Sequence, residues 1–306
     1  MKIFHLSAQV LPLIGLRVDK CQNQYRKNIQ DTIKLCKTGC TKKTILERKE
    51  GSPTKKERLH YIDSVYCLNN RTGTTSTFEI PGARTRFDDF VVYHIQQTLF
   101  VHASGLLLPY HRYYVWLYEK ALREDNGAFI PNRDPISIVI SNGPTLVFPP
   151  ATGGGCVYSG PFTPDKFQIR LGPIGYEPQG LQGGLDLSLV FSQDTRPTNF
   201  TKLLDGPGDV HGSGHFLMGT VGLDVFASPS DPVFWLRHAQ ADRLWTIWQG
   251  QDPRSRINQV WGTGTTGDCD PNVTLDSQIT LGVISPPKKI RDAVLSIDGD
   301  LCYLYG

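Results

Sequence analysis

The sequence of 306 residues has no uninterrupted apolar run of about 18 residues, so we expect no membrane-spanning helix. It has no internal repeat and no low-complexity tract, so no repeat architecture is indicated. It also lacks a strong net charge, since the formal value is only +3. Its basic residues gather mainly in "KLCKTGCTKKTILERKEGSPTKKER", which we interpret as a solvated face, and we expect no nucleic-acid partner.

The cysteines include no Cys-x-x-Cys pair, which argues against a zinc knuckle. There are seven, dispersed along the chain: Cys21, Cys36, Cys40, Cys67, Cys156, Cys269 and Cys302. Dispersed cysteines favour disulfides in an oxidising compartment, and the odd number leaves at least one of them unpaired.

The N-terminus gives a mixed signal for secretion. Residues 1–17 combine Lys2 with a mostly apolar run, as a signal peptide does, but polar residues and Pro12 interrupt the run and no Ala-x-Ala cleavage site follows. Three glycosylation sequons begin at Asn70, Asn199 and Asn272. We therefore predict a signal peptide over 1–17 and a secreted glycoprotein. A cytoplasmic location is the alternative.

Two segments carry clear helix signals. In "PYHRYYVWLYEKALRE", Pro109 suits a first helical position and His111 lies on an apolar stripe. In "SDPVFWLRHAQADRLWTIWQ", Asp231 suits the N-cap and His238 lies on a similar stripe. The Gly- and Pro-rich region 126–208 cannot be regular helix, and the tail has short strand-like pieces such as "AVLSI" and "LCYLY".

Six of the eight histidines fall into two sets of three. The first set spans eighteen residues and the second twenty-eight; they are His94, His102 and His111, and His211, His215 and His238. Three neutral imidazoles with an open position make a reactive metal site. Two such sets on helix-like segments therefore predict two bound metal ions.

Helical geometry is compatible with both sets. His211 and His215 are four residues apart, on one helical face, and His238 comes from a second helix. His102 must lie in a loop before the helix of His111, because nine helical steps would place the two rings half a turn out of phase. Four helices around a buried metal pair would satisfy these constraints.

The residues near the histidines limit the choice of metal ion. No carboxylate stands at ligand spacing, which argues against a di-iron site, so copper is favoured. There is also no glutamate in "DVHGSGHFLMG", unlike the helix of a His-Glu-x-x-His metalloprotease. Asp242 is placed to accept the second N–H of His238, although it could equally pair with Arg237 or Arg243.

Several segments resemble the tyrosinase and catechol oxidase family. "VVYHIQQTLFVHASGLLLPYHRYYVWLYEKALRE" is similar to its first copper region, and "DVHGSGHFLMG" with "SPSDPVFWLRHAQADRLWTIWQ" is similar to its second. "YIDSVYCL", "PGARTRFDDFV" and "GGGCVYSGPF" resemble the short fungal branch. The resemblance implies a mainly α fold, a four-helix bundle around a dicopper site, with long irregular loops and a few short strands. It also implies a single catalytic domain over 18–306 without a C-terminal lid domain.

The resemblance also implies a type-3 copper oxidase. Two copper ions, one on each histidine set, would use dioxygen to oxidise a small phenolic substrate, an o-diphenol or o-aminophenol, to an o-quinone. In the family, a residue just after the first ligand of the second copper, often asparagine, helps a glutamate to deprotonate monophenols. Here that place is Gly212, and the carboxylate would be Asp205 or Asp209. We therefore expect little monophenol hydroxylation.

Two aromatic residues, Phe216 and Phe226, are the candidates to line the substrate entrance. The chain also departs from the family pattern: "FIPNRDPISIVIS" stands where an aromatic-rich segment is usual, and Arg237 replaces a common histidine. Two alternatives therefore remain, an inactive relic without intact packing and a haemocyanin-like dioxygen-binding protein. The sequence does not indicate the oligomeric state.

Overall fold

The computed structural model describes residues 24–25, 27–28, 46–48, 54–124, 160–172, 175–180, 211–212, 215, 220–266 and 270–305. The predicted signal peptide over 1–17 lies outside this part of the chain. Of the helices in these ranges, none has the length and apolar character that a bilayer span requires.

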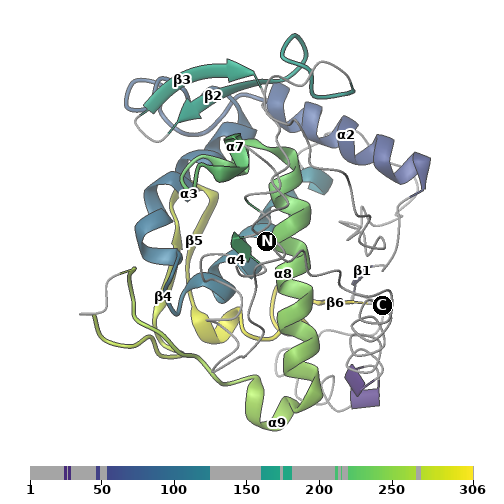
Figure 1. Ribbon diagram of the computed structural model, residues 1–306, viewed down its shortest axis with the longest axis vertical. Coiled ribbons are helices and arrows are strands. Elements are labelled where there is room, and N and C mark those ends of the chain that lie inside the picture. Colours follow the sequence, from purple (N-terminus) through teal and green to yellow (C-terminus); the bar gives the residue numbers. More distant parts are fainter. Residues whose placement is uncertain are drawn as a thin grey trace, which may run out of the picture.

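Four long helices dominate the described part of the chain, with α8 in the middle of the view and α2 at its edge (Figure 1). They are α2 (Lys55–Asn70), α3 (Arg86–Val101), α4 (Leu107–Glu124) and α8 (Pro232–Gln251). Helix α4 packs against α8, and α2 packs against both α3 and α4. This arrangement confirms the predicted mainly α bundle.

The remaining helical elements are short. Helix α7 (Thr220–Leu223) and the 3-10 turn η1 (Ser228–Ser230) lead into α8, and α9 (Pro253–Arg256) follows it. Two more 3-10 turns, η2 (Gly282–Ile284) and η3 (Ile290–Asp292), flank one of the strands near the C-terminus.

In the part of the chain that the structure describes, the strands form three two-stranded sheets. Strands β2 (Gln168–Gly172) and β3 (Gly175–Gly180) pair antiparallel, as do β4 (Gln278–Leu281) and β5 (Ser285–Lys289). Strand β1 (Leu46–Arg48) pairs in parallel with β6 (Tyr303–Tyr305), with Leu46 opposite Tyr303. The strand predicted in "LCYLY" is therefore confirmed, and it joins the C-terminal end to an early segment.

The strand-like piece "AVLSI", residues 293–297, is not a strand in the structure. Its five residues are buried in a turn after η3. The backbone carbonyl of Val294 accepts hydrogen bonds from Arg112 of α4 and Gln249 of α8, at 2.6 and 2.8 Å. Its apolar residues reflect burial against the two helices, so the strand prediction was wrong here.

Side-chain caps fix where the ligand-bearing helices begin. Thr85 and Asp88 form a capping box at α3, and the carboxylate of Asp231 accepts the backbone N–H of Val233 at 2.9 Å at α8. This confirms Asp231 as N-cap. Helix α4 begins at Leu107, so Pro109 is its third residue and not its first. A proline is tolerated there, because the N–H groups of the first turn have no partner within the helix.

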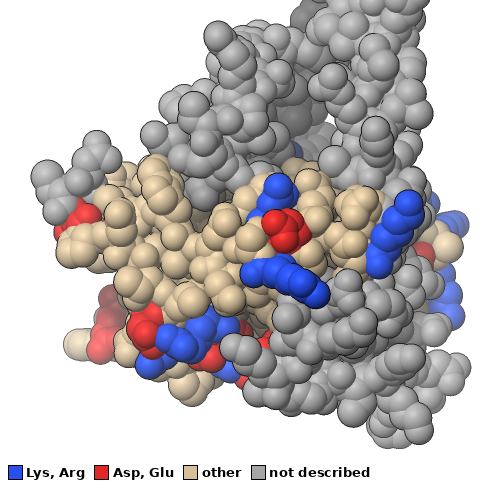
Figure 2. All heavy atoms as spheres, turned by 90° about the horizontal axis from the view of Figure 1, so that it is seen from below, with Lys and Arg blue, Asp and Glu red and all other residues tan. Residues whose placement is uncertain are grey.

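An aromatic core holds the bundle together. The rings of Tyr118 in α4 and Trp235 in α8 stack at 3.7 Å between centroids, and Phe90 of α3 meets both edge-on. All three are fully buried. The surface differs: on the face shown in Figure 2, basic and acidic side chains lie beside one another, without separation into patches of one sign.

Candidate metal centre

The first histidine triad comes from α3, its C-terminal cap and α4. His94 lies inside α3, His102 is the C-cap of α3 with an extended backbone, and His111 lies in the second turn of α4. Ala103 has a φ of 47°, a left-handed conformation that reverses the chain directly after His102. The predicted loop position of His102 is thus confirmed.

The turn after His102 needs a glycine at Gly105. A Cβ atom there would lie 2.4 Å from Val273 Cγ2 and 2.8 Å from the carbonyl oxygen of Trp261. The backbone N–H of Gly105 donates to the carbonyl of Thr263 at 2.9 Å. The segment 261–266 therefore holds the turn between His102 and His111 in place.

Backbone carbonyls orient all three rings. The Nδ1 atoms of His94, His102 and His111 lie 2.7, 3.0 and 2.8 Å from the carbonyl oxygens of Phe226, Thr98 and Leu107. A carbonyl can only accept, so each Nδ1 carries the proton and donates it. Each Nε2 atom therefore has its lone pair directed away from these bonds, as a metal ligand requires.

The second triad joins a short helical segment to α8. His211 and His215 lie one helical turn apart, and His238 lies in the second turn of α8. The three Nε2 atoms form a triangle with sides of 3.0, 3.2 and 3.4 Å. The Nδ1 atom of His215 donates to the carbonyl oxygen of Gly222 in α7 at 2.8 Å.

Both triads fit a metal ion. In each, the ligand atoms lie within 4.8 Å of one another. The Nε2 atoms of His94 and His111 are buried without a hydrogen-bond partner among the described residues, a state that a metal would relieve. Nitrogen ligands bonded at about 2.0–2.1 Å around a tetrahedral ion lie roughly 3.3 Å apart, which matches the triangle of the second triad.

The electrostatic environment keeps the rings neutral. Burial lowers the pKa of four of the histidines well below its usual value, and these are His94, His111, His215 and His238. Burial, assisted by the nearby charge of Arg237, lowers the pKa of His211 to about 3. Neutral imidazole is the form that binds metal, so these five rings need no deprotonation at neutral pH.

The two triads adjoin each other. The rings of His111 and His238 stack at 4.2 Å between centroids, and those of His102 and His211 stack at 5.9 Å. Phe234, which is fully buried, packs its ring 4.0 Å from that of His238 and 5.3 Å from that of His94. One buried aromatic side chain therefore packs against a ligand of each triad.

Asp242 has partners other than the predicted one. Four donors reach its carboxylate, and the N–H of His238 is not among them: they are Arg112 Nε at 2.5 Å, Arg48 at 3.2 Å, Tyr305 Oη at 2.7 Å and Tyr303 Oη. Arg237 and Arg243, the alternative partners of Asp242, are not among these four donors. Burial would raise the pKa of Asp242, but Arg112 and Arg48 outweigh it and hold that pKa below its usual range.

This buried network ties both ligand helices to the β1–β6 pair. Arg48 of β1 also binds Glu119 of α4 at 2.5 Å, and its guanidinium lies 3.6 Å from the ring centroid of Tyr303. Arg112, next to His111, also donates to Thr246 of α8 at 2.8 Å. The sequence analysis did not identify this network, because its members lie far apart in the chain. The position of Arg112 directly after the ligand His111 was one signal that could have indicated it.

The other predicted site residues have mixed outcomes. Gly212 is helical and directly follows His211, and Phe226 is half-buried with its carbonyl bound to His94. Arg237 lies 3.5 Å from the carbonyl of His211, and burial lowers its pKa to about 10. The carboxylate candidates and the second gate residue lie outside the described residues: Asp205, Asp209 and Phe216.

Comparison with known proteins agrees with this geometry. The common central domain of tyrosinase matches residues 84–188 and 185–251, which include all six histidines. Tyrosinase P of Aspergillus terreus is 31% identical over 322 aligned residues, with 83% of this chain and 90% of that protein covered. The N-acetyl-6-hydroxytryptophan oxidase of Emericella nidulans is also 31% identical, with 87% and 93% covered.

A solved structure is similar over nearly the whole chain. A mutant of the polyphenol oxidase from Thermothelomyces thermophila superposes with a TM-score of 0.77 at 30% identity, with 94% of this chain and 97% of that chain covered. The family uses two copper ions, and the two triads fit one each. From its sequence, its fold and its paired histidine sites, this chain belongs to the tyrosinase family of copper oxidoreductases, in its fungal branch.

Proposed function

We propose that the protein oxidises o-diphenols and o-aminophenols with dioxygen, and that it hydroxylates monophenols poorly. For a diphenol, two substrate molecules each lose two electrons and two protons and become o-quinones. One dioxygen molecule accepts the four electrons and four protons and becomes two water molecules. The pair of adjoining, buried histidine triads is the observation that carries this proposal.

The chain's own residues prepare the site for this chemistry. Bound copper supplies the binding of dioxygen and the transfer of electrons from the substrate. The carbonyls of Phe226, Thr98 and Leu107 fix the ring orientations of the first triad before any metal arrives. The buried ring of Phe234 keeps the centre dry, which strengthens every electrostatic interaction in it.

The preference for diphenols rests on Gly212. A monophenol must lose its proton as it reaches the metal, which takes a positioned base or water. Gly212 directly follows the ligand His211 and has no side chain to hold such a water. A Gly212→Asn variant should therefore raise the rate of monophenol hydroxylation relative to catechol oxidation, with copper content unchanged.

The relatives widen the range of substrates to test. One of them is named an oxidase of N-acetyl-6-hydroxytryptophan, so a hydroxyindole belongs beside catechol, 2-aminophenol and a simple monophenol. The deciding experiment measures copper per chain and then oxygen uptake with each of the four compounds. We expect two copper ions, and one dioxygen consumed for every two catechol molecules oxidised.

The outcomes separate the rivals. Two copper ions with reversible dioxygen binding but no catechol oxidation would favour a haemocyanin-like carrier. Fewer than two copper ions in a folded sample would favour an inactive relic. Oxidation of the monophenol as fast as of catechol would contradict the role given to Gly212.

We also propose that the chain passes through the secretory pathway. Cys302 is disulfide-bonded whereas Cys67 is a free thiol, and the sequon residues Asn70 and Asn272 are exposed. These observations support the proposal, because disulfides and accessible acceptor asparagines suit that compartment. A mass shift on deglycosylation of protein from a fungal host would test it, and an unshifted mass would count against it.

A further inference from the structure

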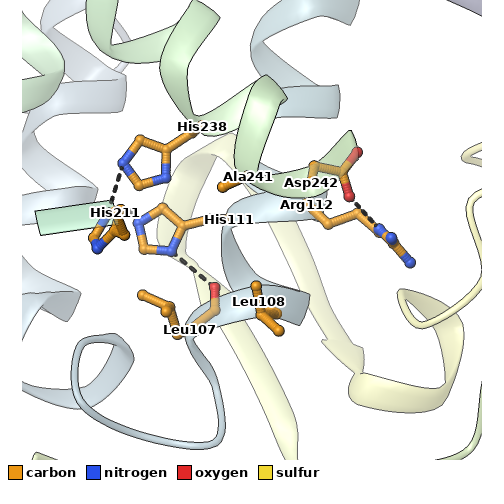
Figure 3. A pocket seen from close by; sticks show the side chains of 8 residues that line it. All are labelled: Leu107, Leu108, His111, Arg112, His211, His238, Ala241 and Asp242. Carbon is orange, nitrogen blue, oxygen red and sulfur yellow. Dashed lines mark hydrogen bonds and ion pairs between the residues drawn. The ribbon is translucent and has the colours of Figure 1, made fainter. Parts of the chain in front are cut away.

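A small cavity adjoins the histidine centre between α4 and α8 (Figure 3). Its volume is about 10 Å³, which is room for about one molecule of the size of water. Ligands of both triads form one side of it, and aliphatic side chains form much of the rest: His111, His211 and His238, with Leu107, Leu108 and Ala241.

Figure 3 shows the histidines on one side of the cavity and the Arg112–Asp242 pair on the other, with Leu108 and Ala241 between them. Leu108 and Ala241 are half-exposed, whereas the other six lining residues are buried. The three histidines belong to both metal positions. A molecule in the cavity would therefore lie next to both sites.

This side of the centre is not the predicted phenol entrance. The gate candidate Phe226 lies at His94, to which its carbonyl is bound, and the other candidate directly follows His215 in the sequence. Neither His94 nor His215 lines the cavity. The cavity is also too small for an aromatic ring.

The lining favours an apolar occupant over water. The Nε2 atoms of the three lining histidines belong to the metal positions, and Nδ1 of His111 donates to the Leu107 carbonyl. The other polar groups of the lining belong to Arg112 and Asp242, which bind each other. Arg112 also binds Gln249, Thr246 and the Val294 carbonyl, and Asp242 also binds Arg48, Tyr303 and Tyr305. A buried water needs two to four polar partners, and an apolar cavity without them stays dry. Dioxygen needs no hydrogen bond and partitions into hydrocarbon.

We propose that this cavity is a binding site through which dioxygen reaches the metal centre, on a route separate from that of the phenol. The role in catalysis rests on the proposed oxidase function, whereas the binding of an apolar gas does not. Gas binding and turnover can therefore be tested independently.

The first test needs no activity. Crystals of the full chain as purified, whatever its copper content, would be pressurised with krypton, an apolar atom with a strong anomalous signal. We expect an anomalous peak among Leu107, Leu108 and Ala241, and its loss in an Ala241→Leu variant, whose side chain would fill the space. Absence of the peak in the wild-type cavity would overturn the proposal.

The second test measures turnover. In Ala241→Leu we expect the KM for dioxygen to rise roughly five- to tenfold, with the KM for catechol and the kcat at saturating dioxygen unchanged. Gln96→Leu places the same side chain on an exposed position of α3 and should change none of these constants. Equal increases in both KM values would mean general damage to the site and would contradict a separate gas route.

The combined outcomes are decisive. Krypton binding with an unchanged KM for dioxygen would show that gas enters the cavity without using it as the route, which overturns the proposal. If Ala241→Leu does not fold, the wild-type krypton map still decides whether the site exists. If the wild type oxidises no phenol, the proposed function fails while the gas site is judged on the crystals alone.

Discussion

The two histidine triads use the same ligand atoms, but the first is oriented largely within its own helices and the second by contacts between segments. In the first, His102 and His111 each donate to the carbonyl four residues earlier, at Thr98 and Leu107, and His94 alone donates to another segment, at Phe226. In the second, His215 donates to Gly222, seven residues on, and His238 comes from a separate helix. His215 is also half-buried, whereas the first triad is entirely buried.

This difference separates orientation by local helix geometry from orientation by tertiary packing. A ring that donates within its own helix keeps its direction as long as the helix lasts. A ring that donates to another element depends on the relative placement of both. We therefore expect the first metal position to hold copper more tightly than the second.

Removing one ligand from each triad should give the largest effect. His111→Ala and His215→Ala should each lower oxygen uptake with catechol by about a thousandfold or more, because dioxygen must be held by two ions. They should differ in retained copper after dialysis against a chelator. His215→Ala should keep one ion in the intact first triad, and His111→Ala should keep less than one.

Copper per chain and oxygen uptake on both variants check this prediction. If His111→Ala retained copper as firmly as His215→Ala, the comparison between a locally oriented and a packing-oriented triad would fail.

The next largest effect concerns the carboxylate shared by both ligand helices. Asp242 on α8 binds Arg112, the neighbour of His111 on α4, and its loss would leave the buried guanidinium of Arg112 without a carboxylate and that of Arg48 with Glu119 alone. Asp242→Leu should therefore lower the free energy of unfolding by roughly 3–5 kcal/mol. Urea denaturation measures the change.

A matched control is Asp276→Leu. Asp276 also pairs with two cations, Lys289 and Arg291, but at the exposed surface. Its loss should leave the urea midpoint nearly unchanged, because solvent screens such pairs. Equal losses in the two variants would mean that burial does not distinguish the two carboxylates.

The sequence predicted more of the locally oriented triad than of the tertiary contacts. The six histidines, the loop position of His102 and the cap at Asp231 all follow from spacing and local chemistry. The donors to Asp242 did not, because Arg48 and Tyr305 are 194 and 63 residues away in the sequence. The burial of "AVLSI" was visible as hydrophobicity, but the periodicity of five residues cannot distinguish a strand from a buried turn.

Two carboxylates of α8 should respond differently to pH: Asp231 at its N-cap and Asp242 within it. Burial raises the pKa of Asp231 to about 6, whereas arginines hold that of Asp242 low. Asp231 therefore binds its proton more tightly in the folded protein than in the unfolded chain. Its contribution to stability is fully present below pH 3.8 and is lost as the pH rises towards 6 and above.

Asp231→Asn keeps an oxygen for the cap but cannot ionise. The unfolding free energy of this variant, relative to wild type, should rise by about 2 kcal/mol between pH 4 and pH 7. Urea titrations of both proteins across this range measure the difference, in which other titrating groups cancel. A difference independent of pH would show that Asp231 is ionised in the fold at a normal pKa.

The smallest expected effect tests whether helix caps matter to the metal sites. Thr85 caps α3, which holds His94 and ends at His102, and Thr54 caps α2, which has no ligand. Thr85→Ala and Thr54→Ala should each lower the unfolding free energy by about 1 kcal/mol, because each removes the side-chain acceptor of one capping box. Copper loss to a chelator should accelerate only in Thr85→Ala, since α3 carries His94 and the Thr98 carbonyl that orients His102. Equal copper release from the two variants would mean that tertiary packing, and not the helix itself, orients the first triad.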